Sequence, residues 1–327
     1  MRMRTIRLVA ALSLIASRAG FAQRPAFVVP TWAFPTLQAE VPSSVRPGDT
    51  TVRTLAHSNR SFTSAQLRDL LNPPDWRPES HPPAPGVVLH ARKEMKYACG
   101  LCHLPDGQGR SENATIAGLP EEYIRRQVAE IRSGARAPAA EFTAAALMKE
   151  VVMAATDEEV AAAAKYFAGI RPRRQYTVVE ATVVPRTYQA GGLYARRGGD
   201  ETEALGDRML EVSDDIEHHE LRDPNETFTV YVQPGTLAKG RALAITVRSD
   251  SPTRCATCHG ADLRGGAGGT VGPPIAGKSP LYLLRQLVGF RTKTRNGAMS
   301  APMQFVTQRL SLEQMIAAAA YAGSRAP

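Results

Sequence analysis

The 327-residue chain is poor in cysteine and in aromatic residues, and it lacks an apolar stretch long enough to span a bilayer. A membrane-spanning helix needs about 20 apolar residues in succession, and no segment after the N-terminal region approaches that length. Aromatic residues make up only 6% of the chain and are not interleaved with Arg/Lys runs, which argues against nucleic-acid binding. The net charge of +9 is better explained by weak electrostatic docking to a protein partner.

All four cysteines belong to two Cys-x-x-Cys-His motifs, at residues 99–103 and 255–259. This pentapeptide is the attachment sequence of c-type haem, in which both thiols add to the haem vinyl groups and the histidine reaches the iron. A thioredoxin-like site needs no histidine there, and the two halves of a zinc ribbon lie about 15–20 residues apart. These motifs begin 156 residues apart, so we predict two covalently bound haem c groups. The attachment residues are Cys99, Cys102, Cys255 and Cys258, and the proximal iron ligands are His103 and His259.

Residues 1–22 have the composition of a secretory signal peptide. Three arginines precede an apolar stretch at residues 8–16, and a small-residue cleavage site follows at 20–22. Arg18 is unusual in the cleavage region and leaves an uncleaved anchor as the alternative. Because c-type haem is attached outside the energy-transducing membrane, we expect a periplasmic protein with no membrane span after signal cleavage.

Two segments of the chain resemble one another at nearly constant offsets of 155 to 159 residues. The matched pairs include Ile116/Ile275, Tyr123/Tyr282, Gln127/Gln286, Arg136/Arg295, Met148/Met303 and Tyr166/Tyr321. An internal repeat of this kind predicts two homologous structural units, one at residues 89–170 and one at 238–327.

Each unit is expected to contain three helices. The first carries the haem motif, and the second covers about residues 120–133 in one unit and 280–290 in the other, where apolar residues share one face. The third begins with a capping box, at 156–159 and 311–314, and continues into an alanine-rich run that permits close helix packing. The predicted fold is therefore mainly α.

A methionine opposite the histidine would complete the iron coordination and raise the reduction potential. Met148 and Met303 stand at the same repeat position, in stretches expected to be loops, and we predict that they are the distal ligands. Met153 and Met299 remain the competing candidates. Another histidine as sixth ligand is a further alternative, although the histidines outside the motifs, at positions 57, 81, 90, 218 and 219, are expected at the surface.

Two segments lie outside the repeat. Residues 23–88 are rich in proline and are expected to form an extended arm with one short helix near 64–71. Residues 171–237 contain two β-branched or aromatic runs, at 176–184 and 228–232, which predict a small hairpin or sheet between the two units. The acidic stretch at 211–220 is expected to be a solvated face, with a docking surface for a basic partner as the alternative.

The haem motifs, the Gly-Pro-Pro-Ile-Ala-Gly stretch at 272–277, the Met position and the capped last helix resemble the class I c-type cytochromes. The tandem arrangement is similar to that of the cytochrome c4 family of two-haem electron-transfer proteins. The resemblance implies two class I cytochrome c domains, each of three helices. It also implies that the carbonyl of Pro274, and of Thr115 in the first unit, accepts a hydrogen bond from the proximal histidine.

The expected function is electron transfer without catalysis, from a quinol-oxidising complex or a periplasmic dehydrogenase to a terminal oxidase or another acceptor. One alternative is a two-haem peroxidase, a family of similar length and haem spacing. Its distal His/Glu pocket and Phe-His-Asp-type segments are not found in this sequence. Another alternative is the cytochrome subunit of a dehydrogenase complex, which keeps the carrier chemistry and changes only the partner.

Overall fold

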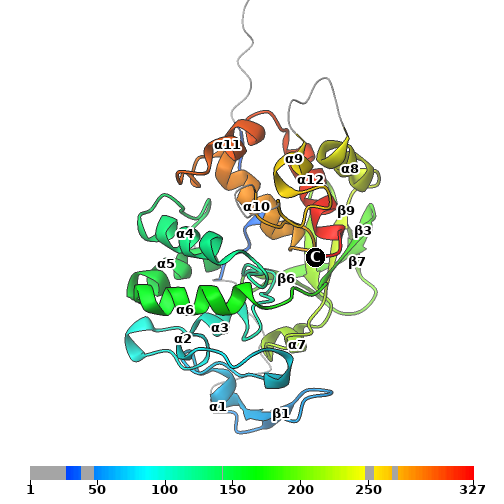
Figure 1. The fold of residues 1–327 in the computed structure, drawn as a ribbon. Coiled ribbons are helices and arrows are strands. Elements are labelled where there is room, and N and C mark those ends of the chain that lie inside the picture. Colours follow the sequence, from blue (N-terminus) through cyan, green and yellow to red (C-terminus); the bar gives the residue numbers. More distant parts are fainter. Residues whose placement is uncertain (1–26, 38–47, 142, 247–253, 267–271) are drawn as a thin grey trace, which may run out of the picture.

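The computed structural model describes residues 27–37, 48–141, 143–246, 254–266 and 272–327, and Figure 1 shows their arrangement. The expected signal peptide at residues 1–22 lies outside the described residues. Two groups of helices, drawn in green and in orange to red, lie beside one another, and a β-sheet lies next to them. Within the described part of the chain, no helix is both long and apolar enough to cross a membrane.

The two helical units contain the same series of elements. In the first unit these are α3 (Cys99–His103), α4 (Glu121–Arg132), α5 (Ala144–Ala154) and α6 (Asp157–Ala168). In the second they are α9 (Cys255–His259), α10 (Pro280–Arg291), α11 (Ala301–Thr307) and α12 (Leu312–Ser324). A short helix precedes each haem motif, α2 (Gly86–Leu89) in the first unit and α8 (Thr236–Ile245) in the second.

The expectation of three helices in each unit was incomplete, because α5 and α11 form a further helix between the second and the last. Met148 lies in α5 and Met303 in α11, where the sequence had predicted loops. The α5 sequence AAALMKEVVMA consists mostly of strong helix formers, so propensity favours the helix even though no simple apolar stripe marks it.

Both predicted capping boxes are confirmed. Thr156 accepts from the backbone N–H of Glu159 at 3.2 Å, and the Glu159 carboxylate accepts from the N–H of Thr156 at 2.7 Å. Ser311 and Gln314 make the equivalent pair at 3.2 and 2.9 Å. Each cap stabilises its helix by about 1 kcal/mol and fixes where the helix starts.

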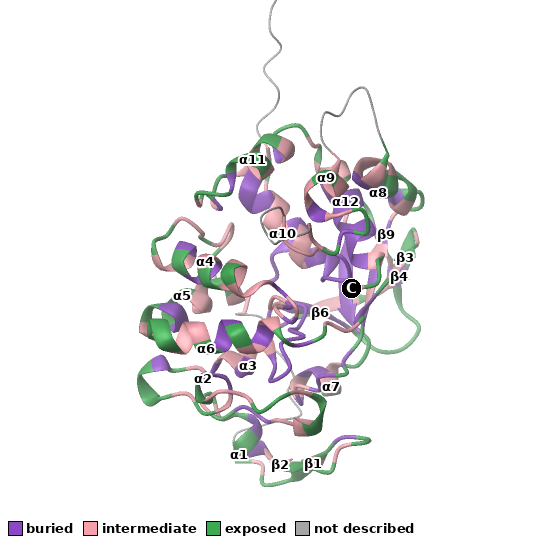
Figure 2. Ribbon diagram, viewed as in Figure 1, coloured by how far each residue is buried: buried purple, intermediate pink, exposed green. Residues whose placement is uncertain are grey.

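Alanine in the last helix allows the close crossing that the sequence predicted. A Cβ added at Gly240 of α8 would lie 2.1 Å from the carbonyl oxygen of Ala317 in α12. Residues 315–323 of α12 are all buried, as the purple of α12 in Figure 2 shows. The same helix also packs against the sheet, so α12 lies between two other layers of structure.

The predicted β-structure is a five-stranded sheet of order β3-β9-β8-β6-β5, with a separate pair β4-β7. The strands are β3 (Tyr176–Glu180), β4 (Val183–Pro185), β5 (Thr187–Ala190), β6 (Leu193–Arg196), β7 (Thr202–Ala204), β8 (Leu210–Ser213) and β9 (Phe228–Val232). β3 and β9 pair in parallel and so do not form the hairpin that was the alternative. The long stretch between them supplies the crossover that a parallel pair needs. One face of the sheet forms the largest core, with Leu281, Leu284 and Met315 of the second unit.

The N-terminal segment is folded, which corrects the prediction of an extended arm. It contains the hairpin β1 (Val52–Thr54) and β2 (Ser61–Thr63) and the short helix α1 (Ser64–Leu67), which confirms the helix expected there. Trp76 is 1% exposed, packs edge-on to Phe62 at 4.7 Å, and donates from its ring N–H to the carbonyl of Leu221 at 2.7 Å. The arm is thereby attached to the inserted segment.

The acidic stretch is not wholly a solvated face, because its first residue is buried. Glu211 lies in β8, accepts from the hydroxyl of Ser279 at 2.9 and 2.8 Å, and accepts from the N–H of Leu281 at 3.1 Å. Burial raises the pKa of Glu211. This carboxyl therefore binds the first turn of α10, where the unpaired N–H groups of a helix favour an acceptor.

Lys278 connects the two units directly. It follows the Ile-Ala-Gly segment of the second unit, and its Nζ donates to the carbonyls of Thr115 and Ala117 in the first unit, both at 3.2 Å. Burial lowers the pKa of Lys278 to about 7. The ammonium is thus held beneath the loop that follows the first haem motif.

We predict that replacing Trp76 by Phe lowers the free energy of unfolding by about 1–3 kcal/mol, because the buried carbonyl of Leu221 loses its donor. Urea denaturation followed by circular dichroism measures this change. The same substitution at the half-buried Trp32 should cost less. Equal costs at both positions would show that the Trp76 hydrogen bond contributes little.

We also predict that stability rises with pH between about 7 and 10. In the folded chain Lys278 loses its proton near pH 7, whereas in the unfolded chain it keeps it until about pH 10.4, so the unfolded state binds more protons in this window. Lys278→Met should flatten the rise, which is at most about 1.4 kcal/mol per pH unit. Urea unfolding at pH 7, 8 and 9 measures the slope, with exposed Lys239→Met as the control. An unchanged slope in the Lys278 variant would contradict the assignment.

Candidate functional site

The two haem motifs form matching single-turn helices. α3 begins at Cys99 and α9 at Cys255, each directly after an extended residue. In both motifs the residue directly after the histidine has a positive φ, 62° at Leu104 and 85° at Gly260. This turn ends each helix at its histidine and sends the following loop back beneath the ring.

That loop fixes the proximal histidines. The Nδ1–H of His103 donates to the carbonyl of Ala114 at 2.8 Å, and that of His259 donates to the carbonyl of Pro273 at 2.7 Å. Burial lowers the pKa of both rings, which favours neutral imidazole. With the proton held at Nδ1, Nε2 keeps the lone pair that a metal needs.

The acceptor carbonyls are one residue earlier than the resemblance implied. The expectation was Thr115 and Pro274, whereas the structure uses Ala114 and Pro273. In the first unit the carbonyl of Thr115 accepts from Lys278 instead. Since a backbone carbonyl serves in both units, the Thr/Pro difference between the units leaves the histidine contact unchanged.

In the first unit the predicted residues surround one cavity of about 690 Å³. Cys99, Cys102 and His103 contribute from α3, and Met148 contributes from α5. The competing Met153 also lies in α5, but it is 61% exposed and does not line the cavity. Of the two candidates, the structure brings only Met148 together with the motif.

In the second unit the same residue types stand on equivalent elements. Cys255, Cys258 and His259 lie in α9, and a Cβ added at Gly272 would be 2.6 Å from the His259 ring, so this glycine lets the loop approach the imidazole. Met303 lies half-buried in α11, whereas Met299 is 57% exposed just before that helix.

Five arginines line the first cavity, which sequence reasoning had not assigned to the site: Arg110, Arg136, Arg222, Arg285 and Arg295. Buried nitrogens on four of them, all except Arg136, have no hydrogen-bond partner among the described residues. Unpaired buried donors are costly and call for acceptors in the cavity. The two propionates of a haem are such acceptors, so the residues present fit haem c.

Two of these arginines form a pseudo-symmetric contact between the units. Arg136 donates to Tyr282 and Gln286 of the second unit, both at 3.1 Å. Arg295 donates to Tyr123 at 3.5 Å and to Gln127 at 2.7 Å in the first unit. Adjacent backbone hydrogen bonds reinforce the contact, from Ala137 to Thr294 and from Asn296 to Ala135. The internal repeat had already matched these arginine, tyrosine and glutamine residues in three pairs. A repeat by itself does not predict that its two copies contact each other.

The expectation that the other histidines lie at the surface holds for His57, His90 and His218. It is wrong for His81, whose side chain is 3% exposed, and for His219, which is buried. The Nδ1 of His219 lies 2.9 Å from both carboxylate oxygens of Glu226, and its Nε2 faces Arg110 and Glu112. Burial and Arg110 would lower the pKa of His219, but the two carboxylates outweigh them and raise it. This buried ion network connects the inserted segment to the cavity wall.

Residues 238–324 match the Cytochrome c family. No curated protein matches the chain. Among solved structures, the chain is similar to the as-isolated thiosulfate dehydrogenase TsdBA from Marichromatium purpuratum, with 26% identity and a TM-score of 0.46 over 70% of this chain and 36% of that one. It thus spans about a third of that protein.

Two further similar structures are cytochromes c4. That from Pseudomonas stutzeri has 18% identity and a TM-score of 0.46, covering 69% of this chain and 93% of its own. That from Acidithiobacillus ferrooxidans has 20% identity and a TM-score of 0.45, covering 69% and 98%. By the family match, residues 238–324 are a Cytochrome c domain, which implies covalently bound haem c and redox partners.

Proposed function

We propose that this chain is an exported c-type cytochrome with two haem groups, which carries single electrons between redox proteins and does not turn over a substrate. The observation that carries the proposal is the convergence of Cys99, Cys102, His103 and Met148 on one cavity. Two thiols, a neutral imidazole and a thioether are the groups that attach a haem and occupy both axial positions of its iron.

The repeat extends the proposal to the second unit. Cys255, Cys258 and His259 repeat the motif on α9, and Met303 repeats Met148 on α11. Two class I cytochrome c domains, at residues 89–170 and 238–327, are the arrangement that this correspondence supports. The contact between Arg136 and Arg295 places the two units against each other, as a protein that passes electrons internally requires.

Haem iron supplies reversible exchange of one electron when it is bound. The residues of the chain determine how easily that exchange occurs. A methionine ligand raises the reduction potential, and burial of the ring keeps water from the metal. If His103 and Met148 both held the iron, no open position would remain for peroxide or another substrate, which favours a carrier over a peroxidase.

The cytochrome subunit of a dehydrogenase complex is the second candidate. The observation in its favour is that Arg222 folds the inserted segment onto the first unit, and Trp76 attaches the arm to that inserted segment, so both enlarge the surface of the first unit. The chemistry at the two sites is the same in both cases. A quinol-oxidising complex or periplasmic dehydrogenase as donor, and a terminal oxidase as acceptor, complete the proposal.

We predict that the protein, made together with the haem-attachment machinery and exported, carries two covalent haem groups. Mass spectrometry of the intact chain should show two haem additions and an N-terminus after residue 22. Loss of one addition in Cys255→Ala/Cys258→Ala, with the other retained, is the matched control. A single addition in the unaltered chain, or bound zinc, would contradict the proposal.

We predict that Met148→Ala and Met303→Ala each abolish the long-wavelength Met–Fe(III) absorption of one haem and lower its potential, because the distal ligand is lost. A spectroscopic redox titration measures both effects. Met153→Ala and Met299→Ala are the matched controls and should change neither. If Met299→Ala acts and Met303→Ala does not, the repeat alignment in the second unit is wrong. A high-spin haem with peroxidase turnover in the unaltered protein would favour the enzyme.

A further inference from the structure

The two haem-attachment helices are covered to different extents. The residue directly before the second cysteine of the motif is Leu101 in α3 and Thr257 in α9. Leu101 is 4% exposed, whereas Thr257 is exposed. The guanidinium of Arg222, from the inserted segment, donates to the carbonyl of Leu101 at 2.7 Å. The insertion therefore covers the first helix.

The loops after the two histidines differ in the same way. Asp106 in the first unit is 2% exposed and pairs with Arg173 at 2.5 Å. Its counterpart in the second unit, Asp262, has an exposed side chain, and among the described residues its ion-pair partner is the exposed Arg264 at 3.7 Å. The correspondence is fixed by the backbone, because the N–H of the residue after each aspartate bonds to the carbonyl directly after the histidine.

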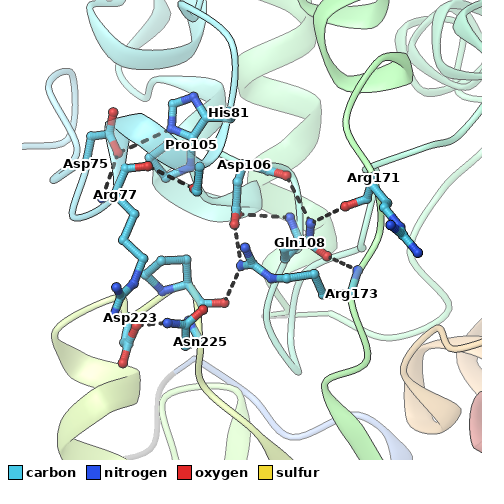
Figure 3. A network of polar contacts seen from close by, with 12 residues as sticks. Asp75, Arg77, His81, Pro105, Asp106, Gln108, Arg171, Arg173, Asp223 and Asn225 are labelled. Atoms are coloured by element: carbon cyan, nitrogen blue, oxygen red, sulfur yellow. Dashed lines mark hydrogen bonds and ion pairs between the residues drawn. The ribbon is translucent and has the colours of Figure 1, made fainter. Parts of the chain in front are cut away.

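Figure 3 shows the residues that cover the loop after His103. Asp106 and Gln108 meet Arg173 and the backbone of Arg171 at the start of the insertion, and Arg173 also reaches Pro224 later in the insertion. From the arm, His81 pairs with Asp75, and Tyr166 bonds to both His81 and the carbonyl of Pro105. Three segments of the chain thus lie over the loop of one unit.

The loop after His259, which is exposed to solvent, is surrounded by basic residues. Arg254 precedes α9, and Arg264 follows the loop and bonds to the carbonyl of Ala326 at 3.2 Å. Arg325, next to Ala326, is exposed and lies over the ring of Tyr321, which packs in one cluster with Cys255. The described part of this loop contains one acidic residue, Asp262, beside the three arginines.

We propose that the second unit alone exchanges electrons with an acidic redox partner, which docks on the face formed by Thr257, Arg254, Arg264 and Arg325. The thioether edge of a haem lies at its attachment helix, and electron transfer falls off steeply with distance. The edge behind α9 is therefore the one within reach of a docked protein, while the first unit exchanges electrons only with the second. This inference rests on the proposed two-haem function.

A pair of matched variants tests the proposal on the intact two-haem protein. Arg264→Glu alters the open loop, and Arg171→Glu alters an exposed side chain beside the closed loop, pointing away from its network in Figure 3. Stopped-flow oxidation of the reduced protein by ferricyanide transfers one electron from each ferrous haem and yields ferrocyanide. At low salt Arg264→Glu should slow this step several-fold, and Arg171→Glu should leave it unchanged. With the cationic oxidant tris(phenanthroline)cobalt(III), Arg264→Glu should not slow the step.

A binding measurement without electron transfer completes the test. Hexacyanochromate(III), a redox-inert paramagnetic anion, should broaden the amide signals of Thr257 and Asp262 and leave those of Leu101 and Asp106 sharp. Equal slowing by both variants, or broadening at Leu101 and Asp106, overturns the proposal. If mass spectrometry finds fewer than two haems, the proposed function fails instead, so the two failures are distinguishable.

Discussion

The hydrogen bond from the His103 imidazole to the carbonyl of Ala114 is the contact on which the first site depends. It holds the ring, assigns its proton to Nδ1 and leaves Nε2 for the metal. A carbonyl can do this only if its own backbone is fixed. Lys278 provides that support from the second unit by binding the carbonyls of Thr115 and Ala117, on either side of Ile116. The geometry of one unit is therefore set partly by a side chain of the other.

Arginine side chains make hydrogen bonds across the contact between the units, beside apolar packing of Ala139 and Ala140 against the core that contains Leu281. Arg136 and Arg295 donate to tyrosine and glutamine, which are neutral, and both line the first cavity. Buried cations that lack carboxylate partners carry a desolvation cost, which anionic groups in the cavity would offset. A haem bound in this cavity would thus couple its own binding to unit packing, because the same guanidinium groups would serve both.

Local signals in the sequence predicted the parts of the site that depend on neighbouring residues. The Cys-x-x-Cys-His spacing, the capping boxes at Thr156 and Ser311, and the β-character of residues 228–232 each act within a few positions, and the structure contains the corresponding elements. The helix that carries Met148 was missed because its propensity is spread along eleven residues without a stripe.

Contacts between distant segments could not be read from the sequence in the same way. Arg222 meets Leu101 across 121 positions and Trp76 meets Leu221 across 145, and neither partner has a composition that identifies the other. The buried His219 was expected at the surface for the same reason, since its partners Arg110 and Glu112 lie more than a hundred residues earlier. The proline-rich arm was expected to be extended because proline opposes helices, yet Trp76 and His81 anchor it to the insertion and to the first unit.

The carbonyl of Ala33 accepts from the Nε of Arg285 at 2.6 Å, across 252 positions of the chain. Ala33 and Phe34 also lie in the core that α10 and α12 complete. A ribosome makes the chain from the N-terminus, so Ala33 must remain without its partner Arg285 until α10 has been made. Completion of this core is then a late event, and a chain stopped before α10 would lack the part of the core that Leu281, Leu284 and Met315 supply.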